Sequence, residues 1–120
     1  MQKLTKAEEE VMHLLWKKGR AMVSELIALM PDPQPPHSTI SSIMRILEKK
    51  GFVDHKAYGR TYEYFPLVTK DEYSRKSLVQ FAQDYFGGSV NKMVSFLVQK
   101  EDLSLSDLEE IRQMLNKRGS

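Results

Sequence analysis

The sequence predicts a mainly α-helical fold with one small β-hairpin. Apolar side chains recur at helical spacing in three stretches before Gly51. After Gly51 the pattern changes to two short β-rich runs separated by a turn that contains Gly59. Helical spacing returns from Lys70 onward. Three helices followed by a two-stranded ribbon have the element order of a winged helix-turn-helix, so we expect this fold in residues 1–69 and a C-terminal helical region in residues 70–120.

The first helix is predicted at residues 5–18. Thr5 and Glu8 have the spacing of a capping box, and Gly19 ends the helical pattern. Its broad apolar face consists of Val11, Met12, Leu14, Leu15 and Trp16. A shorter second helix in "MVSELIALM" ends at "PDPQPP", because the prolines of that segment cannot continue the hydrogen bonding.

The third helix is predicted from about His37 to Lys50, and its two faces differ in chemistry. The inward face carries Ile40, Ile43, Met44 and Leu47. The outward face carries small hydroxyls around one arginine, namely Ser38, Ser41, Ser42, Arg45 and Lys49. Arginine can bind guanine through two hydrogen bonds and serine can bond base edges or phosphates, so this face is typical of a helix that enters the major groove of DNA. The alternative is an ordinary solvated face, and the basic ribbon that follows favours recognition.

The ribbon consists of "FVDHK" and "TYEYFP", joined by "AYGR". At its tip, beside His55, we expect Lys56 and Arg60 to contact phosphates and Tyr58 to bond a phosphate or pack on a sugar. Residues 45–60 hold five basic and two acidic side chains, a local balance of +3 against +2 for the whole chain. An alternative interpretation is that charges on an exposed hairpin only prevent edge pairing. The aromatic residues within the strands are expected to pack on the helices; they are Tyr62, Tyr64 and Phe65.

The region after residue 70 carries apolar stripes that three short helices would leave partly uncovered in a monomer. We therefore expect a second copy to cover them, which makes the protein a homodimer. The predicted dimer contacts are Leu78, Phe81, Tyr85, Val90, Met93, Val94, Leu97, Leu108, Ile111 and Leu115. Two caps compete for the start of the last helix, Ser104 with Asp107 and Ser106 with Glu109.

Several classes of protein are disfavoured by what the sequence lacks. Without cysteine there is no disulfide framework, thiolate zinc site or cysteine nucleophile. The histidines His13, His37 and His55 have no metal-ligand spacing, and no Gly-x-Ser-x-Gly elbow or phosphate loop occurs, so we predict no metal, no cofactor and no enzyme. The charged start and the absence of a long apolar run predict a cytoplasmic protein without membrane insertion.

Three long segments resemble one family of bacterial regulators. The segments are "LTKAEEEVMHLLWKKG", "STISSIMRILEKKGFVDHKAYGRTYEY" and "FGGSVNKMVSFLVQKEDLSLSDLEEIRQML". They are similar to the penicillinase-repressor (BlaI/MecI/CopY) family over nearly the whole chain, and "LEKKGFVDHK" and "FLVQKEDLS" are the most specific matches. The resemblance implies a transcriptional repressor whose homodimer binds a pseudo-palindromic operator. It places Ser38, Thr39, Ser41, Ser42 and Arg45 in the DNA-reading helix and Lys56, Tyr58 and Arg60 in the wing.

The chain departs from the family pattern in three places. The β-lactam-responsive branch typically has a basic residue at the position of Ser41, so its operator sequence does not transfer. The copper-responsive branch ends in a cysteine cluster that is missing here. In the β-lactam branch a membrane sensor protease triggers cleavage between Asn and Phe, and the matching bond is Ser95–Phe96, where serine replaces asparagine. A winged-helix module that binds other proteins without reading DNA remains the alternative function.

Overall fold

The structure is a computed structural model that describes the backbone of residues 2–101 and 104–116. Side chains are described for residues 2–99, 104 and 106–113. The chain divides into two compact units, residues 1–70 and 71–120. No helix in the described ranges is long and apolar enough to cross a membrane.

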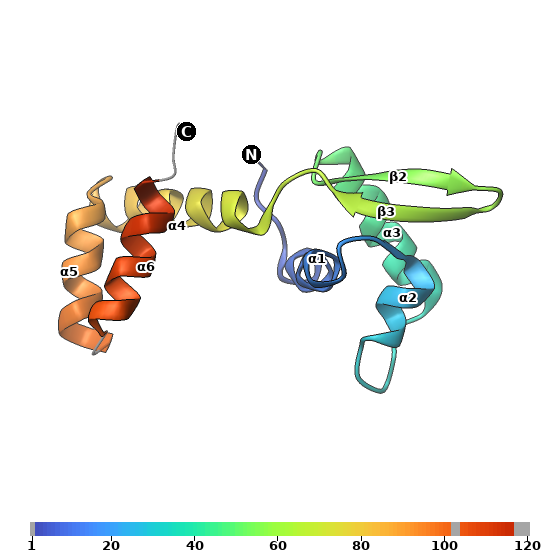
Figure 1. Cartoon of the computed structure of the whole chain (residues 1–120), viewed down its shortest axis with the longest axis horizontal. Helices are drawn as coiled ribbons and strands as arrows, with labels where there is room; N and C mark the ends of the chain where they lie inside the picture. Colours follow the sequence, from blue (N-terminus) through green and yellow to red (C-terminus); the bar gives the residue numbers. More distant parts are fainter. Residues whose placement is uncertain (1, 102–103, 117–120) are drawn as a thin grey trace. The chain divides into compact units, whose positions relative to one another are not determined.

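The first unit has three helices and a small antiparallel sheet, as the sequence predicts (Figure 1). In chain order its elements are α1 (Lys6–Lys18), β1 (Ala21–Met22), α2 (Val23–Ala28), α3 (His37–Lys49), β2 (Val53–Tyr58) and β3 (Thr61–Pro66). The strand order is β1-β3-β2, with Tyr64 of β3 opposite Ala21 on one side and His55 on the other. Strand β1 is an addition to the predicted hairpin. Two residues are too few to show an alternating pattern in the sequence.

The helix ends follow the local signals in the sequence. The Thr5 hydroxyl accepts from the Glu8 backbone N–H at 3.2 Å, while the Thr5 N–H donates to the Glu8 carboxylate at 3.0 Å, so the predicted capping box of α1 is present. Helix α3 ends before Gly51, whose φ of 83° is favourable only for glycine. The Phe52 N–H then donates to the Leu47 carbonyl at 2.9 Å, which leads the chain from the helix into β2.

The core of the first unit fixes which face of α3 points outward. Its buried apolar side chains include Val11, Met12, Leu15, Leu26, Ile40, Met44, Leu47, Phe52, Val53 and Tyr64. Ile40, Met44 and Leu47 are buried as predicted, whereas Ile43 is only half-buried. Because these residues occupy one side of the helix, the hydroxyls and Arg45 lie on the other.

Lys50 and Trp16 make polar contacts to residues far away in the sequence of this unit. Lys50, just after α3, donates to the carboxylate of Glu8 at 2.6 Å and to the carbonyl of Lys3 at 3.2 Å. The indole N–H of Trp16 donates to the Val68 carbonyl at 2.8 Å, which holds the segment after β3 against α1. Burial alone raises the pKa of Glu8, but the hydrogen bonds and charge of Lys50 and the bonds from Thr5 outweigh it, so the pKa is lower than usual.

Within the described residues, the second unit consists of helices and short connections between them. Its helices are α4 (Lys70–Phe86), α5 (Val90–Glu101) and α6 (Leu105–Asn116). Ser104 and Asp107 exchange two hydrogen bonds, at 3.1 and 3.2 Å, and this pair therefore caps α6 rather than Ser106 and Glu109. Ala82 and Met93 are each only 1% exposed and form the interior of the unit.

Candidate nucleic-acid interface

Helix α3 presents a continuous polar face to solvent. Ser38, Ser42, Arg45 and Lys49 are exposed, spaced three or four residues apart so that they follow one side of the helix. Arg45 donates to the Ser42 hydroxyl at 3.3 Å, and the Ser41 hydroxyl lies 3.2 Å from Nδ1 of His37. These contacts within the helix hold its polar groups in a defined orientation. Thr39 is also exposed, while Ser41 is half-buried.

One apolar side chain on this surface was missed by the sequence analysis. Ile46 follows Arg45 directly and is 43% exposed, on the same side of α3 as Thr39. An exposed methyl-bearing side chain beside an arginine suits contact with the methyl group of thymine. The sequence could have indicated that Ile46 is exposed, because it does not share the helical spacing of the inward residues Ile40, Met44 and Leu47.

The ribbon carries the second group of predicted residues. Lys56, Tyr58 and Arg60 are all exposed, and Tyr58 keeps 53% of its surface. The ammonium of Lys56 lies 5.5 Å from the centre of the Tyr58 ring, which orients both side chains on one face of β2. Gly59 has a φ of 65°, as the two-residue turn between Tyr58 and Thr61 requires.

A hollow of about 270 Å3 lies between the start of α2, helix α3 and the ribbon. Its wall includes His37 and Ser41 from α3 and Arg60 and Tyr62 from the ribbon. It thus brings together groups from both of the elements that the sequence analysis selected. Imidazole, guanidinium and hydroxyl groups around an open hollow can hold an anionic oxygen such as that of a phosphate.

Three expectations for the ribbon and its surroundings were wrong in detail. Tyr64 is buried as expected, but Tyr62 is 46% exposed and stacks on His55, with ring centres 4.0 Å apart. His55 lies near the base of the ribbon instead of its tip, where its ring pairs with Glu48. Lys50 was counted in the local positive charge, although its ammonium is bound to Glu8. All three differences involve side-chain contacts between different helices or strands, which the spacing of apolar residues along the sequence does not predict.

The pKa of the buried Tyr64 phenol reflects its burial and the charges of α3 next to it. Burial raises the pKa of its phenol, and the nearby carboxylate of Glu48 raises it further, whereas Arg45 lowers it. The phenol therefore stays neutral at physiological pH and acts as part of the core.

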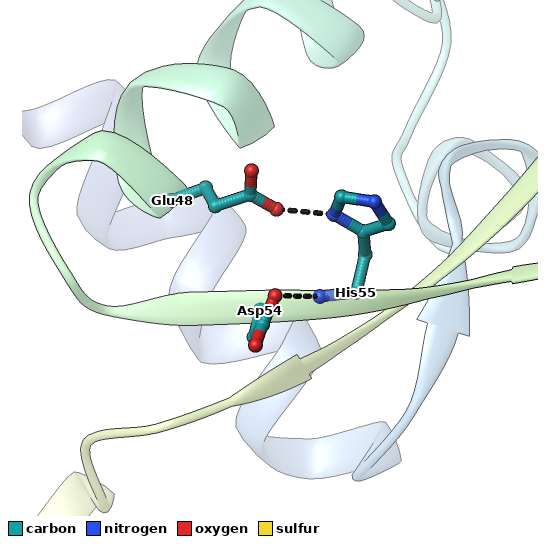
Figure 2. A group of neighbouring side chains, drawn as sticks. All are labelled: Glu48, Asp54 and His55. Carbon is teal, nitrogen blue, oxygen red and sulfur yellow. Dashed lines mark hydrogen bonds and ion pairs between the residues drawn. The ribbon is translucent and has the colours of Figure 1, made fainter.

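Glu48, Asp54 and His55 form a small cluster where α3 meets β2 (Figure 2). The carboxylate of Glu48 pairs with Nδ1 of His55, while the carboxylate of Asp54 accepts from the His55 backbone N–H at 2.8 Å. No metal ligand was predicted here, because the histidines of the sequence lack metal-ligand spacing. In the folded chain, the carboxylates of Glu48 and Asp54 lie close to one of these histidines, His55.

The predicted dimer residues differ in exposure within the single chain. Phe81 and Tyr85 are 47% and 71% exposed, and their ring centres lie 4.8 Å apart on α4. Half-buried residues are Leu78, Val90, Val94, Leu97, Leu108 and Ile111. Met93 is buried within the unit, and the side chain of Leu115 lies outside the described residues. Ser95 is exposed and Phe96 is 46% exposed, so both residues of the predicted cleavage bond are on the surface of α5.

Comparisons with known proteins agree with this architecture. The family model described as penicillinase repressor matches residues 4–117. The chain is 34% identical to the methicillin resistance regulatory protein MecI of Staphylococcus aureus strain N315, covering 96% of this chain and 94% of that protein. It is 27% identical to the penicillinase repressor of Bacillus licheniformis, covering 93% and 88%.

A solved structure supports the fold of the first unit. The solution structure of the DNA binding domain of the repressor BlaI matches with a TM-score of 0.52 and 31% identity, covering 61% of this chain and 94% of that one. The family model spans both units, so the likeness is not confined to a common winged helix. The chain belongs to the penicillinase repressor family of bacterial transcriptional repressors.

Proposed function

We propose that the protein binds a pseudo-palindromic operator as a homodimer, with α3 in the major groove and the β2–β3 turn along the backbone. The observation that carries this proposal is the exposed polar face of α3 beside an exposed basic ribbon tip. The relatives named as repressors, and the DNA binding domain of BlaI, support double-stranded DNA as the partner.

Each element has its own part in binding. Lys56 and Arg60 attract phosphates and release counterions, which supplies affinity without sequence preference. Arg45 reads guanine in the groove, while Ser38, Ser42 and Thr39 bond base edges or phosphates. Ile46 adds an apolar contact to this reading face.

The second unit supplies the symmetry that an operator with two half-sites requires. Its exposed aromatic side chains are Phe81, Tyr85 and Phe96. Phe86 lies between them, with its ring centre 6.0 Å from that of Phe81 and 5.6 Å from that of Phe96. Covering them with the same surface of a second copy makes an isologous interface. Two linked winged helices then bind one duplex with a higher effective affinity than either alone.

Release from DNA through cleavage of the Ser95–Phe96 bond is part of the proposal, and it rests on the family resemblance. The bond lies inside α5 (Val90–Glu101), so a protease has to unwind this helix locally before it can act. Incubation with an activated membrane sensor protease, followed by mass spectrometry, tests the step. Fragments that end at Ser95 support it, and an intact bond excludes it.

The competing function is a protein-interaction module that uses the winged helix as a scaffold. Salt dependence separates the two, because DNA binding through several phosphates weakens steeply as the salt concentration rises. Sequencing genomic DNA that co-purifies with the protein, and footprinting the enriched fragments, tests the main proposal. Two protected half-sites about one helical turn or a multiple apart are expected, and absence of any enriched sequence would contradict it.

A further inference from the structure

The cluster at the junction of α3 and β2 combines the ligand types that borderline-soft divalent metals prefer. It offers one imidazole nitrogen from His55 and carboxylate oxygens from Glu48 and Asp54, with these three atoms all within 4.8 Å of one another. Zinc takes histidine nitrogen and carboxylate oxygen at about 2.0–2.2 Å, and the site can be completed by water. A purely acidic cluster would instead favour magnesium or calcium.

The imidazole is already oriented for such a role (Figure 2). Nδ1 of His55 points at the Glu48 carboxylate, and the two groups are in direct contact. One face of the ring stacks on Tyr62, with the ring centres 4.0 Å apart and the ring planes 16° apart. A metal ligand that is held in place loses little conformational entropy when it binds.

The third ligand has the freedom to close the site. Asp54 is exposed on β2, the outer strand of the sheet, and it accepts the outward-facing N–H of His55 at 2.8 Å. Ligand atoms around one zinc ion lie about 3 to 3.5 Å apart, so the outermost pair has to approach by roughly 1 to 2 Å. The Asp54 carboxylate has to rotate away from the His55 backbone N–H, to which water can then bond, and the Glu48 oxygen and Nδ1 of His55 have to move apart to admit the ion.

We propose that Glu48, Asp54 and His55 bind one Zn2+ ion and thereby link helix α3 to strand β2. The ion replaces the hydrogen bond between Glu48 and His55, and the neutral ring then carries its proton on Nε2. This site goes beyond DNA binding, and its occupancy can be measured with or without DNA. Because the ligands come from a helix and a strand, the ion crosslinks two elements of the first unit.

The test measures Zn2+ binding by isothermal titration calorimetry to chelator-treated full-length protein. We expect the parent protein to bind one ion per chain. Each of the variants Glu48→Gln, Asp54→Asn and His55→Phe should lose at least tenfold in Zn2+ affinity, because changes around a metal site typically cost about 10- to 100-fold. His55→Phe keeps a flat ring against Tyr62. Controls are His13→Gln and Glu10→Gln, which remove the same chemical groups from α1 and should bind as the parent does. Unchanged affinity in the three ligand variants, or a loss in the controls, overturns the assignment.

Two further measurements keep the outcome decisive if a variant folds poorly. Co2+ should bind the metal-free parent protein and give visible absorption bands that report nitrogen and oxygen ligands, and added Zn2+ should abolish these bands by displacing the Co2+. Zn2+ should also shift the ring proton signals of His55 in NMR spectra. Mg2+ at the same concentration should neither displace Zn2+ nor shift those signals. Displacement by Mg2+, or shifts at His13 or His37 without shifts at His55, would rule out the proposed nitrogen ligand.

Discussion

The ammonium of Lys50 lies 2.6 Å from the carboxylate of Glu8, forty-two positions earlier in the chain. Glu8 also completes the capping box with Thr5, so one carboxylate serves the start of α1 and the end of α3 at the same time. The position of the proposed DNA-reading helix is thus tied to the first turn of the first helix. Only 7% of the Glu8 side chain is exposed, and 19% of Lys50.

Removing the charge of Lys50 should therefore destabilise the first unit. Lys50→Met keeps the aliphatic stem but leaves the buried Glu8 carboxylate without its cation, and we expect a loss of about 2 kcal/mol in the free energy of unfolding. Urea titration followed by the fluorescence of Trp16, the single tryptophan, measures it. The neighbouring change Lys49→Met is the control and should stay within about 0.5 kcal/mol, because Lys49 is exposed. Equal losses in the two variants would contradict the role of the pair.

Acid should remove the contribution of Glu8 selectively. The folded-state pKa of Glu8 lies below its ordinary value of 4.5, so the ionised carboxylate stabilises the folded state above that pH. The stabilisation is lost as the pH falls through the lower, folded-state pKa. The difference in unfolding free energy between the parent and Glu8→Gln should be constant from about pH 6 to 8 and shrink below about pH 4.5. A difference that grows on acidification would show that the pKa is raised.

The sequence predicted those parts of the fold that local signals determine. The capping box at Thr5, the end of α3 before Gly51 and the turn at Gly59 depend on residues a few positions apart, and each is present in the structure. The periodic apolar positions of α3 likewise determined which face is outward. Local chemistry was enough for the helices and the hairpin.

The unpredicted features depend on contacts across the chain. The strand β1 exists only because β3 pairs with it, and the ion pair of Lys50 needs a carboxylate from another helix. The pairing of Glu48 with His55 follows from how β2 returns along α3. The spacing of apolar residues does not indicate which polar side chains pair with one another. The net positive charge near α3 was therefore overestimated, and the cluster of Glu48, Asp54 and His55 was not predicted.

Arg45→Ala should reduce sequence preference more than affinity for DNA in general. Its guanidinium is exposed on the outward face of α3 and bonds only one turn back, to Ser42, in the described contacts. Loss of a bidentate guanine contact costs about 1 to 3 kcal/mol at the matched site. Competition binding with the operator and with scrambled DNA of equal length measures the change. An equal loss on both would place Arg45 on the phosphate backbone.

Lys56→Ala should show the opposite pattern. Lys56 is exposed on the ribbon beside Tyr58, where a phosphate contact attracts any sequence alike. We expect weaker binding to operator and scrambled DNA by the same factor, and a plot of log affinity against log salt that is flatter by about one unit of slope. Lys76→Ala, an exposed lysine on α4, should leave both quantities unchanged. A steeper slope, or a loss confined to the operator, would argue against the wing assignment.

Tyr85→Glu should dissociate the proposed homodimer without unfolding the second unit. Tyr85 is 71% exposed and its ring lies beside Phe81, so a charge there does not disturb the interior formed by Ala82 and Met93. In a symmetric interface both copies would bring this charge into apolar surroundings, which should raise the dimer dissociation constant at least tenfold, or about 1.4 kcal/mol. Sedimentation equilibrium measures the constant, and circular dichroism checks the helices. Gln83→Glu adds the same charge two residues earlier, on the other side of α4, and should leave the dimer intact. If both variants sediment like the parent, the exposed aromatic surface of α4 is not where two copies meet.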